Sequence, residues 1–450
     1  MTNILWLTLE SKTGGKVMPS AGPAAARKGT CGTCLNLIRT TTAPQTDKQR
    51  FADMSTLAPS AADYEIKVSE EQEVFRRAVR EFAEKELGPV AQKIDRENQM
   101  DMKLVKKAAE LGLFGIPFPE EYGGGGGDDL SMVIGMEEIA RFSAAFAAVI
   151  GASYLVSVPI FLFGNEEQKK KYLVPIARDG TVAAHAMTEP GTGSDVAAIT
   201  TTAQKKGDGY VINGKKMFIT NGDKAGIFLI FARTSPKEEG KRHYGVTAFI
   251  AEKGMQGLTV GQRTDVIGLR GDQPVELVME NLEVPESNIL GEIGRGVRLA
   301  LTTYDHGRIG VAAQGTGLAQ AALEAAVNYS TQRQTFDTYL LNYQQVQFKI
   351  AEMTAAVHTA RLLTYWAATL TNKGKDFIKA SSIAKIAATE AAEKNAHSAM
   401  LIMGAYGVST DMQVERILRD SQIIKTYEGT NDIQRLTIMK EVAKEMGVVG

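Results

Sequence analysis

The chain has 450 residues, with 51 Lys plus Arg against 52 Asp plus Glu, so its net charge is −1. This length exceeds one ordinary hydrophobic core and indicates two or three domains. Balanced charge gives no global field for nucleic acid or an anionic membrane, so neither is expected as a partner. The two cysteines are Cys31 and Cys34, which excludes a disulfide scaffold or thiolate cluster elsewhere.

Residues 1–60 mix Gly, Ala, Thr and Pro with scattered basic residues and show no sustained period. We interpret them as a leader or disordered extension, although Glu10 and Asp53 are unusual in a transit peptide. The alternative is that the gene model is too long at its start and that the real start is Met54. The spacing of Cys31 and Cys34 is typical of a redox motif or half a zinc site, but no second pair lies near, and a non-functional tail is favoured.

Residues 61–182 are predicted to form an all-α domain, because apolar residues recur at intervals of three and four, as in Val74, Phe75, Val79 and Phe82. The glycine run 123–127 is expected to be a flexible loop. The uncharged stretch 144–164 is as long as a membrane span, but it contains Pro159 and is followed by charged residues. We interpret it as a buried core helix, so no membrane span is expected.

Residues 183–290 carry short β-type runs, such as Val246 to Ile250, separated by glycines, and predict a β-barrel or sandwich domain. No proline follows Pro285, and residues 291–450 are rich in Ala, Leu, Gln, Lys and Glu. Long helices are expected at about 293–332, 343–372, 377–404 and 430–447, which predicts a C-terminal four-helix bundle. The fold class is therefore α+β, in the order helices, β domain, helical bundle.

Several common kinds of site are excluded by the motifs that the chain lacks. The five histidines show no HxxxH or HxH spacing, so no metal site is expected. Neither the Rossmann glycine motif nor the P-loop motif occurs.

Three strings are more informative. Residues 187–195 form a Gly-rich turn (Met-Thr-Glu-Pro-Gly-Thr-Gly-Ser-Asp) that could hold a phosphate through backbone N–H groups or be a plain turn. Residues 216–222 alternate like a strand and end in a turn. Residues 425–435 place Glu428 ahead of a helix whose N-cap is Thr430 or Asn431, so this carboxylate is either a helix N-terminal acid or a catalytic base.

A fourth string, Tyr329-x3-Arg333-x2-Phe336 followed by Gln344-x2-Gln347, completes the pattern. In order and spacing, the four strings resemble the acyl-CoA dehydrogenase family of flavoproteins, over roughly residues 62–447. The resemblance implies FAD-dependent α,β-dehydrogenation of an acyl-CoA to a trans-2-enoyl-CoA. Glu428 would be the base for the α-proton, and the β-hydrogen would leave as hydride to flavin N5. In the isovaleryl and long-chain subgroups the base lies at the position of Gly307, which cannot serve here.

The resemblance also assigns binding residues. FAD contacts would come from His185, Met187, Thr188, Ser194, Phe218, Ile219, Thr220, Arg333, Thr335, Phe336, Gln344, Leu401, Gly404, Ala405, Thr430 and Asp432. Contacts to the acyl-CoA would come from Ser194, Asp305, Arg308 and Gly429. Arg333 and Gln344 would reach the FAD of a neighbouring subunit, which implies a homotetramer built as a dimer of dimers. His185, Leu401 and Ala405 depart from the usual family residues, which bears on the fine FAD contacts.

Short- to medium-chain straight acyl groups are expected, because Gly151 and Ala152 leave room in the acyl pocket and Tyr154 limits it. A branched short-chain dehydrogenase, an enoyl-CoA reductase, an oxidase on the same scaffold and a non-enzymatic scaffold protein are the alternatives. The electron partner would be an electron-transferring flavoprotein. The expected location is the cytoplasm, or the mitochondrial matrix in a eukaryote.

Overall fold

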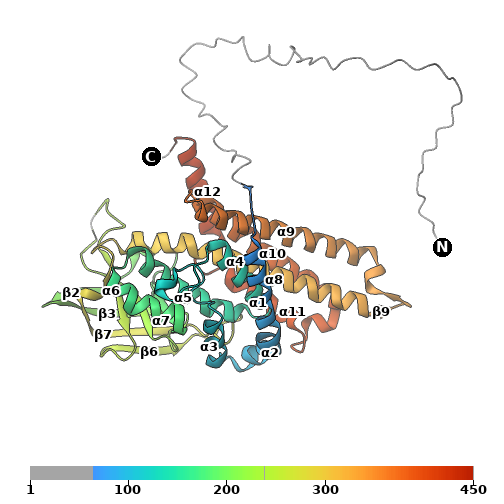
Figure 1. The fold of residues 1–450 in the computed structure, drawn as a ribbon, viewed down its shortest axis with the longest axis horizontal. Helices are drawn as coiled ribbons and strands as arrows, with labels where there is room; N and C mark the ends of the chain where they lie inside the picture. The colour runs from blue at the N-terminus through green and yellow to red at the C-terminus, as the bar shows by residue number, and fades with distance from the viewer. Residues whose placement is uncertain (1–63, 238, 449–450) are drawn as a thin grey trace, which may run out of the picture. The chain divides into compact units, whose positions relative to one another are not determined.

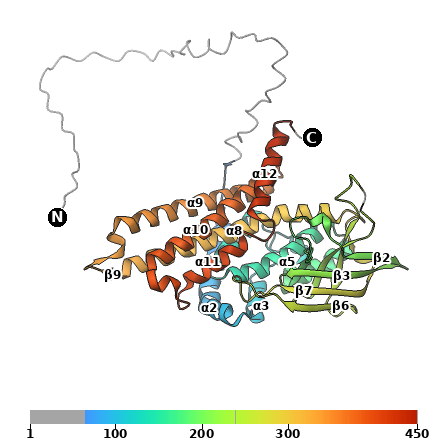
Figure 2. The ribbon, with the colours of Figure 1, turned by 180° about the vertical axis from the view of Figure 1, so that it is seen from behind.

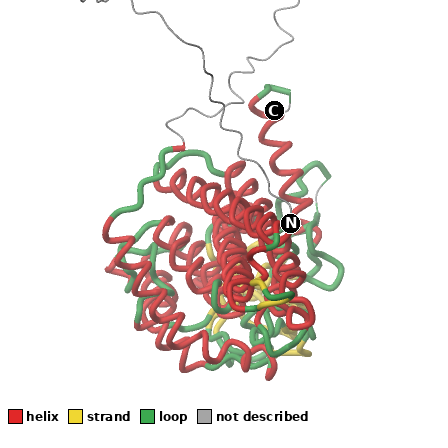
Figure 3. The backbone as a smooth tube through the Cα atoms, turned by 90° about the vertical axis from the view of Figure 1, so that its right-hand side faces the viewer, coloured by secondary structure: helices red, strands yellow, loops and turns green. Residues whose placement is uncertain are grey.

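The computed structural model describes residues 64–237 and 239–448, so the predictions for residues 1–60, including Cys31 and Cys34, lie outside the described residues. Helices come first, a β-sheet follows, and long helices complete the chain (Figure 1). The predicted α+β class and order of parts are confirmed. Figure 3 shows that helices make up most of the described chain.

The N-terminal helices begin with clear capping signals. Ser69 caps the first helix and forms a capping box with Gln72, while Asp101 and Asp128 cap two later helices. The helices are α1 (Glu70–Phe82), α2 (Gly88–Glu97), α3 (Met102–Glu110), α4 (Asp129–Ala140), α5 (Ala144–Phe163), α6 (Glu166–Gln168) and α7 (Val174–Asp179).

The glycine run 123–127 is not the flexible loop that the sequence suggests. Its amides donate to backbone carbonyls within residues 115–120, for example Gly126 N to Phe118 O at 2.9 Å. A Cβ at Gly124 would lie 2.1 Å from Phe118 O, so the backbones approach too closely for any side chain. The run is therefore a tightly bonded turn that holds the segment before α4.

Helix α5 is apolar enough and long enough to cross a membrane, but 67% of its most apolar window is buried in the fold. It packs against α8 and β1. Its Ser153 and Ser157 hydroxyls donate to backbone carbonyls one turn earlier, which satisfies them inside the core. These contacts agree with the prediction of a buried core helix.

The middle of the chain forms one eight-stranded sheet in the order β6-β7-β3-β2-β4-β5-β8, with β1 pairing in parallel with β4. The strands are β1 (Ala183–Ala186), β2 (Thr202–Lys206), β3 (Gly209–Ile219), β4 (Ile227–Arg233), β5 (Val246–Glu252), β6 (Leu258–Arg263), β7 (Val275–Pro285) and β8 (Ile289–Leu290). Strand β4 is buried on both faces. Ile227, Leu229 and Phe231 join the core shared with the helices, while Phe228 and Ile230 join a second core on the other face.

The C-terminal part contains α8 (Gly296–Gln332), α9 (Gln344–Asn372), α10 (Ile378–Met403), α11 (Gln413–Ile424) and α12 (Asn431–Glu445). Four of them match the expected long helices, and α11 was missed. A short hairpin of β9 (Gln334–Thr335) and β10 (Thr338–Tyr339) joins α8 to α9. It lies at the end of the bundle away from the large sheet, as Figures 1 and 2 both show.

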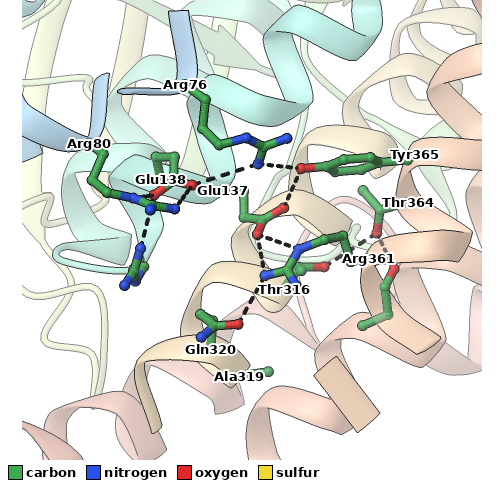
Figure 4. Close-up of polar contacts among 12 residues, drawn as sticks. Arg76, Arg80, Glu137, Glu138, Thr316, Ala319, Gln320, Arg361, Thr364 and Tyr365 are labelled. Carbon is green, nitrogen blue, oxygen red and sulfur yellow. Dashed lines mark hydrogen bonds and ion pairs between the residues drawn. The ribbon is translucent and has the colours of Figure 1, made fainter. Parts of the chain in front are cut away.

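A network of buried charges joins the N-terminal helices to the bundle (Figure 4). Glu137 of α4 accepts two hydrogen bonds from Arg361 of α9 (2.8 and 2.6 Å) and one from the Tyr365 hydroxyl (3.0 Å). Tyr365 in turn accepts from Arg76 of α1 at 2.8 Å. A buried carboxylate is stable only when paired and hydrogen-bonded, so this network fixes how α1, α4 and α9 pack together.

Candidate active site

Glu428 lies in the turn between α11 and α12, with φ 51° in the left-handed region. A residue with a side chain is uncommon there and is held by its surroundings. Its Oε2 is buried and has no hydrogen-bond partner among the described residues. A Cβ at Gly307 of α8 would lie 2.2 Å from this oxygen. The glycine on α8 therefore makes room for the carboxylate.

The Glu428 carboxylate lines a small pocket between α4, α5 and α8. Met132 and Met136 of α4 and Tyr154 of α5 are among its lining residues. Gly151 also lines it, as expected for an acyl pocket, whereas Ala152 is buried and is not among its lining residues. The Tyr154 hydroxyl donates to Leu113 O at 2.8 Å, which fixes its ring as one wall.

Burial and the nearby positive charges shift the pKa of Glu428 in opposite directions. Burial raises the pKa of Glu428, and the positive charges of Lys385 and Arg308 limit that rise. Arg308 is itself buried and ion-paired with Asp305, and its Nε has no partner among the described residues. A carboxylate with a raised pKa, in a mostly apolar pocket and with an oxygen that no donor from the described residues reaches, is suited to accept a proton.

The Gly-rich turn and the following strand are joined by a second buried pair. Lys216 of β3 is 0% exposed and donates to Glu189 Oε1 (2.9 Å) and Met187 O (3.1 Å). Glu189 also accepts hydrogen bonds from the amides of Thr200 and Thr201. Burial alone would raise the pKa of Glu189, but the charge of Lys216 and these hydrogen bonds lower it to about 2. The first two sequence strings thus form one structural unit.

Several of the predicted FAD residues lie on this unit and differ in exposure. The Met217 amide donates to Thr188 O at 2.9 Å, which places Thr188 beside the end of β3. Phe218 is 52% exposed in a left-handed conformation, Ile219 and Met187 are buried, and Ser194 is exposed. Thr220 is half-buried.

His185 of β1 has a specific structural contact. Its Nε2 lies 2.9 Å from the Tyr304 hydroxyl and its Nδ1 lies 3.3 Å from Leu155 O. Burial lowers the pKa of His185 to about 4, so the ring is neutral at pH 7. His185 therefore links β1 to α8 beside the pocket.

The remaining predicted cofactor residues do not join this site within one chain. Phe336 is 94% exposed, and Arg333, Thr335 and Gln344 lie with it around the β9–β10 hairpin at the far end of the bundle (Figure 1). Leu401, Gly404 and Ala405 are exposed at the end of α10. Closer to Glu428, Thr430 caps α12 and accepts from Ile433 N, while Asp432 is exposed and pairs with Arg435. Gly429 follows Glu428 with φ 84°.

Known proteins are similar to this chain in sequence and fold. Three family models match, described as the N-terminal domain (residues 69–180), the middle domain (184–282) and the C-terminal domain (294–443) of acyl-CoA dehydrogenase. The chain belongs to the acyl-CoA dehydrogenase family. Acyl-CoA dehydrogenases are FAD enzymes, so the chain is an oxidoreductase whose cofactor is FAD.

Individual members of the family are similar over most of their length. An acyl-CoA dehydrogenase of Bacillus subtilis is 45% identical over 83% of this chain and 98% of the relative. The mitochondrial short-chain specific acyl-CoA dehydrogenase of Mus musculus is 41% identical over 83% and 90%. The butyryl-CoA dehydrogenase structure from Megasphaera elsdenii matches with a TM-score of 0.81 at 39% identity, covering 84% of this chain and 99% of that one.

Three further residues contact the site and were not singled out from the sequence. Lys385 and Gln434 hold the backbone around Glu428, and Tyr304 contacts His185. Lys385 lies in an Ala- and Ser-rich helical stretch where a lysine is typical of an exposed face. Lys385 is part of the site only because the loop that carries Glu428 packs against α10.

Among the described residues, no group of three or more His, Cys, Asp and Glu side chains could hold a metal ion.

Proposed function

We propose that this acyl-CoA dehydrogenase removes the α-proton of a short-chain acyl-CoA with Glu428. The supporting observation is the buried Oε2 of Glu428, which has no hydrogen-bond partner in the described part of the chain and lies beside Gly307 at the pocket. The raised pKa of Glu428 makes it a stronger base than an exposed carboxylate.

The Glu428 amide is proposed to stabilise the substrate as it loses this proton. Among the described residues the amide has no acceptor, so it is free to donate to a thioester oxygen. A preformed donor of this kind is worth several kcal/mol when charge develops on that oxygen in a site shielded from water, roughly 3 kcal/mol in measured cases. The α-proton is weakly acidic, and this hydrogen bond makes its removal by Glu428 feasible.

The residues present fit FAD, which supplies the hydride acceptor when bound. The half-exposed Phe218 and the open turn around Gly191 and Gly193, where a Cβ would meet no atom within 4 Å, suit a flat ring system and a phosphate. We propose that FAD is also contacted by Met187, Thr188, Ser194, Ile219 and Thr220. His185 is proposed to support this site indirectly, through its contact with Tyr304.

The second set of FAD residues is proposed to serve a neighbouring subunit, because the β9–β10 hairpin lies at the opposite end of the bundle from α12 (Figure 2), the helix that follows Glu428 in sequence. The set comprises Arg333, Thr335, Phe336, Gln344, Leu401, Gly404 and Ala405, with Thr430 and Asp432 near the adenosine half. An apolar side chain as exposed as Phe336 fits this role. The proposed assembly is a dimer of dimers.

The substrate is proposed to be a short, straight acyl-CoA. The pocket is small and is lined by Tyr154, Met132 and Met136. Ser194, Asp305, Arg308 and Gly429 are proposed to bind the CoA side. An electron-transferring flavoprotein as acceptor fits the family.

The test is turnover of saturated acyl-CoAs of graded length and branching with a dye acceptor, for the wild type and for Glu428→Gln. Butyryl-CoA or a near homologue should be the best substrate, and Glu428→Gln should lose more than about 10³-fold in kcat. Normal turnover by Glu428→Gln would show that another group is the base. A preference for branched or long acyl groups would refute the substrate assignment.

A further inference from the structure

Lys385 of α10 is a fully buried lysine that contacts the backbone on both sides of Glu428. It is 0% exposed. Its ammonium donates to Tyr427 O at 2.7 Å and to Gly429 O. A buried ammonium is tolerated only with such partners, and here its partners are the carbonyls that flank one carboxylate-bearing residue.

Gln434 of α12 holds the same turn from the other side. Its Nε2 donates to Gly429 O at 2.9 Å and approaches Glu428 O at 3.3 Å. A Cβ at Gly429 would lie 2.6 Å from this nitrogen, so the turn and the amide are in close contact. Three consecutive carbonyls, of residues 427, 428 and 429, are thus bound by side chains from two helices.

These contacts oppose a local strain. Glu428 has φ 51°, which disfavours a residue with a side chain by about 1 kcal/mol or more. With its carbonyls bound, the turn places the side chain of Glu428 at the pocket, and no acceptor for its amide is found within residues 64–237 and 239–448. The geometry of the proposed base therefore depends on Lys385 and Gln434.

Lys385 also acts on Glu428 through its charge. The two groups interact electrostatically, and the positive charge of Lys385 favours the ionised carboxylate against the effect of burial. Other ionisable groups facing Glu428 or its pocket come from α8, α4, α5 and the adjacent residue: Arg308, Tyr304, His306, Asp129, Tyr154 and Tyr427. Of these, Arg308 is the second cation, and it is already paired with Asp305.

We propose that Lys385 is a positioning residue for catalysis, which fixes the turn carrying Glu428 and places a positive charge beside its carboxylate. This inference rests on the proposed role of Glu428 as the base. Gln434 shares the first task, because it binds the same turn, but it carries no charge and does not share the second.

The test compares Lys385→Met with Gln434→Met in the FAD-loaded enzyme, by single-turnover flavin reduction with butyryl-CoA across pH. Lys385→Met should reduce the maximal rate constant about 10²-fold, while the dissociation constant for butyryl-CoA changes less than threefold. Its acid limb should move up by about one pH unit, because the cation that favours ionised Glu428 is lost. Gln434→Met should slow the reaction without moving the acid limb.

Lys394→Met on α10 is the matched control, because this lysine is exposed and pairs with Glu352 on α9. It should leave the rate and the acid limb unchanged. If Lys385→Met does not fold, Lys385→Gln, which keeps length and polarity but not charge, decides in its place. A rate within threefold of wild type and an unmoved acid limb would overturn the inference. Measured beside them, Glu428→Gln separates the two proposals, because its normal turnover would refute the base itself, whatever the effect of Lys385.

Discussion

Adding a single methyl group at Gly307 should directly displace the carboxylate of the proposed base, Glu428. Alanine at 307 would place Cβ 2.2 Å from Glu428 Oε2 and 2.9 Å from Leu155 Cδ2. Ordinary contact begins at 3.4 Å, so the carboxylate must retreat by about 1 Å. A displacement of this size at a reacting group reduces the rate about 10²-fold, or about 2.7 kcal/mol in activation free energy.

Folding should respond differently from catalysis. Gly307 lies inside α8 without a positive φ, where alanine favours the helix by up to about 1 kcal/mol. Gly307→Ala should therefore keep a melting temperature close to wild type while single-turnover flavin reduction by butyryl-CoA slows about 100-fold. Gly310→Ala is the comparison, because it adds a methyl group to the same pocket where no atom lies within 4 Å. Equal reduction rates for Gly307→Ala and wild type, or equal losses in both variants, would refute the steric argument.

Three further predictions concern the pocket and the strand that supports it. Burial raises the pKa of Glu428, and its protonated form cannot accept a proton, so kcat/KM should fall with decreasing pH at values above the ordinary glutamate range; a limb at or below pH 4.5 would contradict this. Lys216→Met should lower the free energy of unfolding by about 3 kcal/mol in urea, because it leaves Glu189 buried without its cation, and a loss below 1 kcal/mol would show that the other donors to Glu189 suffice. Tyr154→Val should raise the octanoyl-CoA to butyryl-CoA ratio of kcat/KM about tenfold by removing one wall of the pocket, whereas an unchanged ratio would place the end of the acyl chain elsewhere.

The sequence predicted the parts of this enzyme that depend on local pattern. The three-part organisation and the long helices follow from hydrophobic period and from the absence of proline after Pro285. The string around Glu428 alone left its role open, and only the order and spacing of four strings pointed to it as the base. Helix α11, with Val414, Ile417 and Ile424 on its buried face, was overlooked between two more conspicuous segments.

The contacts that the sequence could not predict join residues far apart in the chain. Lys385 lies 42 and 44 residues from its two carbonyl partners, and Lys216 lies 27 residues from Glu189. In each case a lysine in a regular pattern is typical of a solvated face, and only the tertiary fold buries it. The glycine run 123–127 was misjudged for the same reason, because its hydrogen bonds go to a neighbouring segment and not to solvent.

The double burial of β4 has a consequence for how the protein opens. Alternate residues of this strand belong to two separate cores, one shared with the helices from both ends of the chain and one on the far face of the sheet. Either core can loosen while the other still covers one face of β4. Amide protons of β4, paired on one side with β5 and on the other with β1 and β2, should therefore exchange only in global unfolding, and β6, at the sheet edge, should exchange through smaller openings. The most persistent structure would thus lie in the middle of the chain, although most of the helices lie on either side of it.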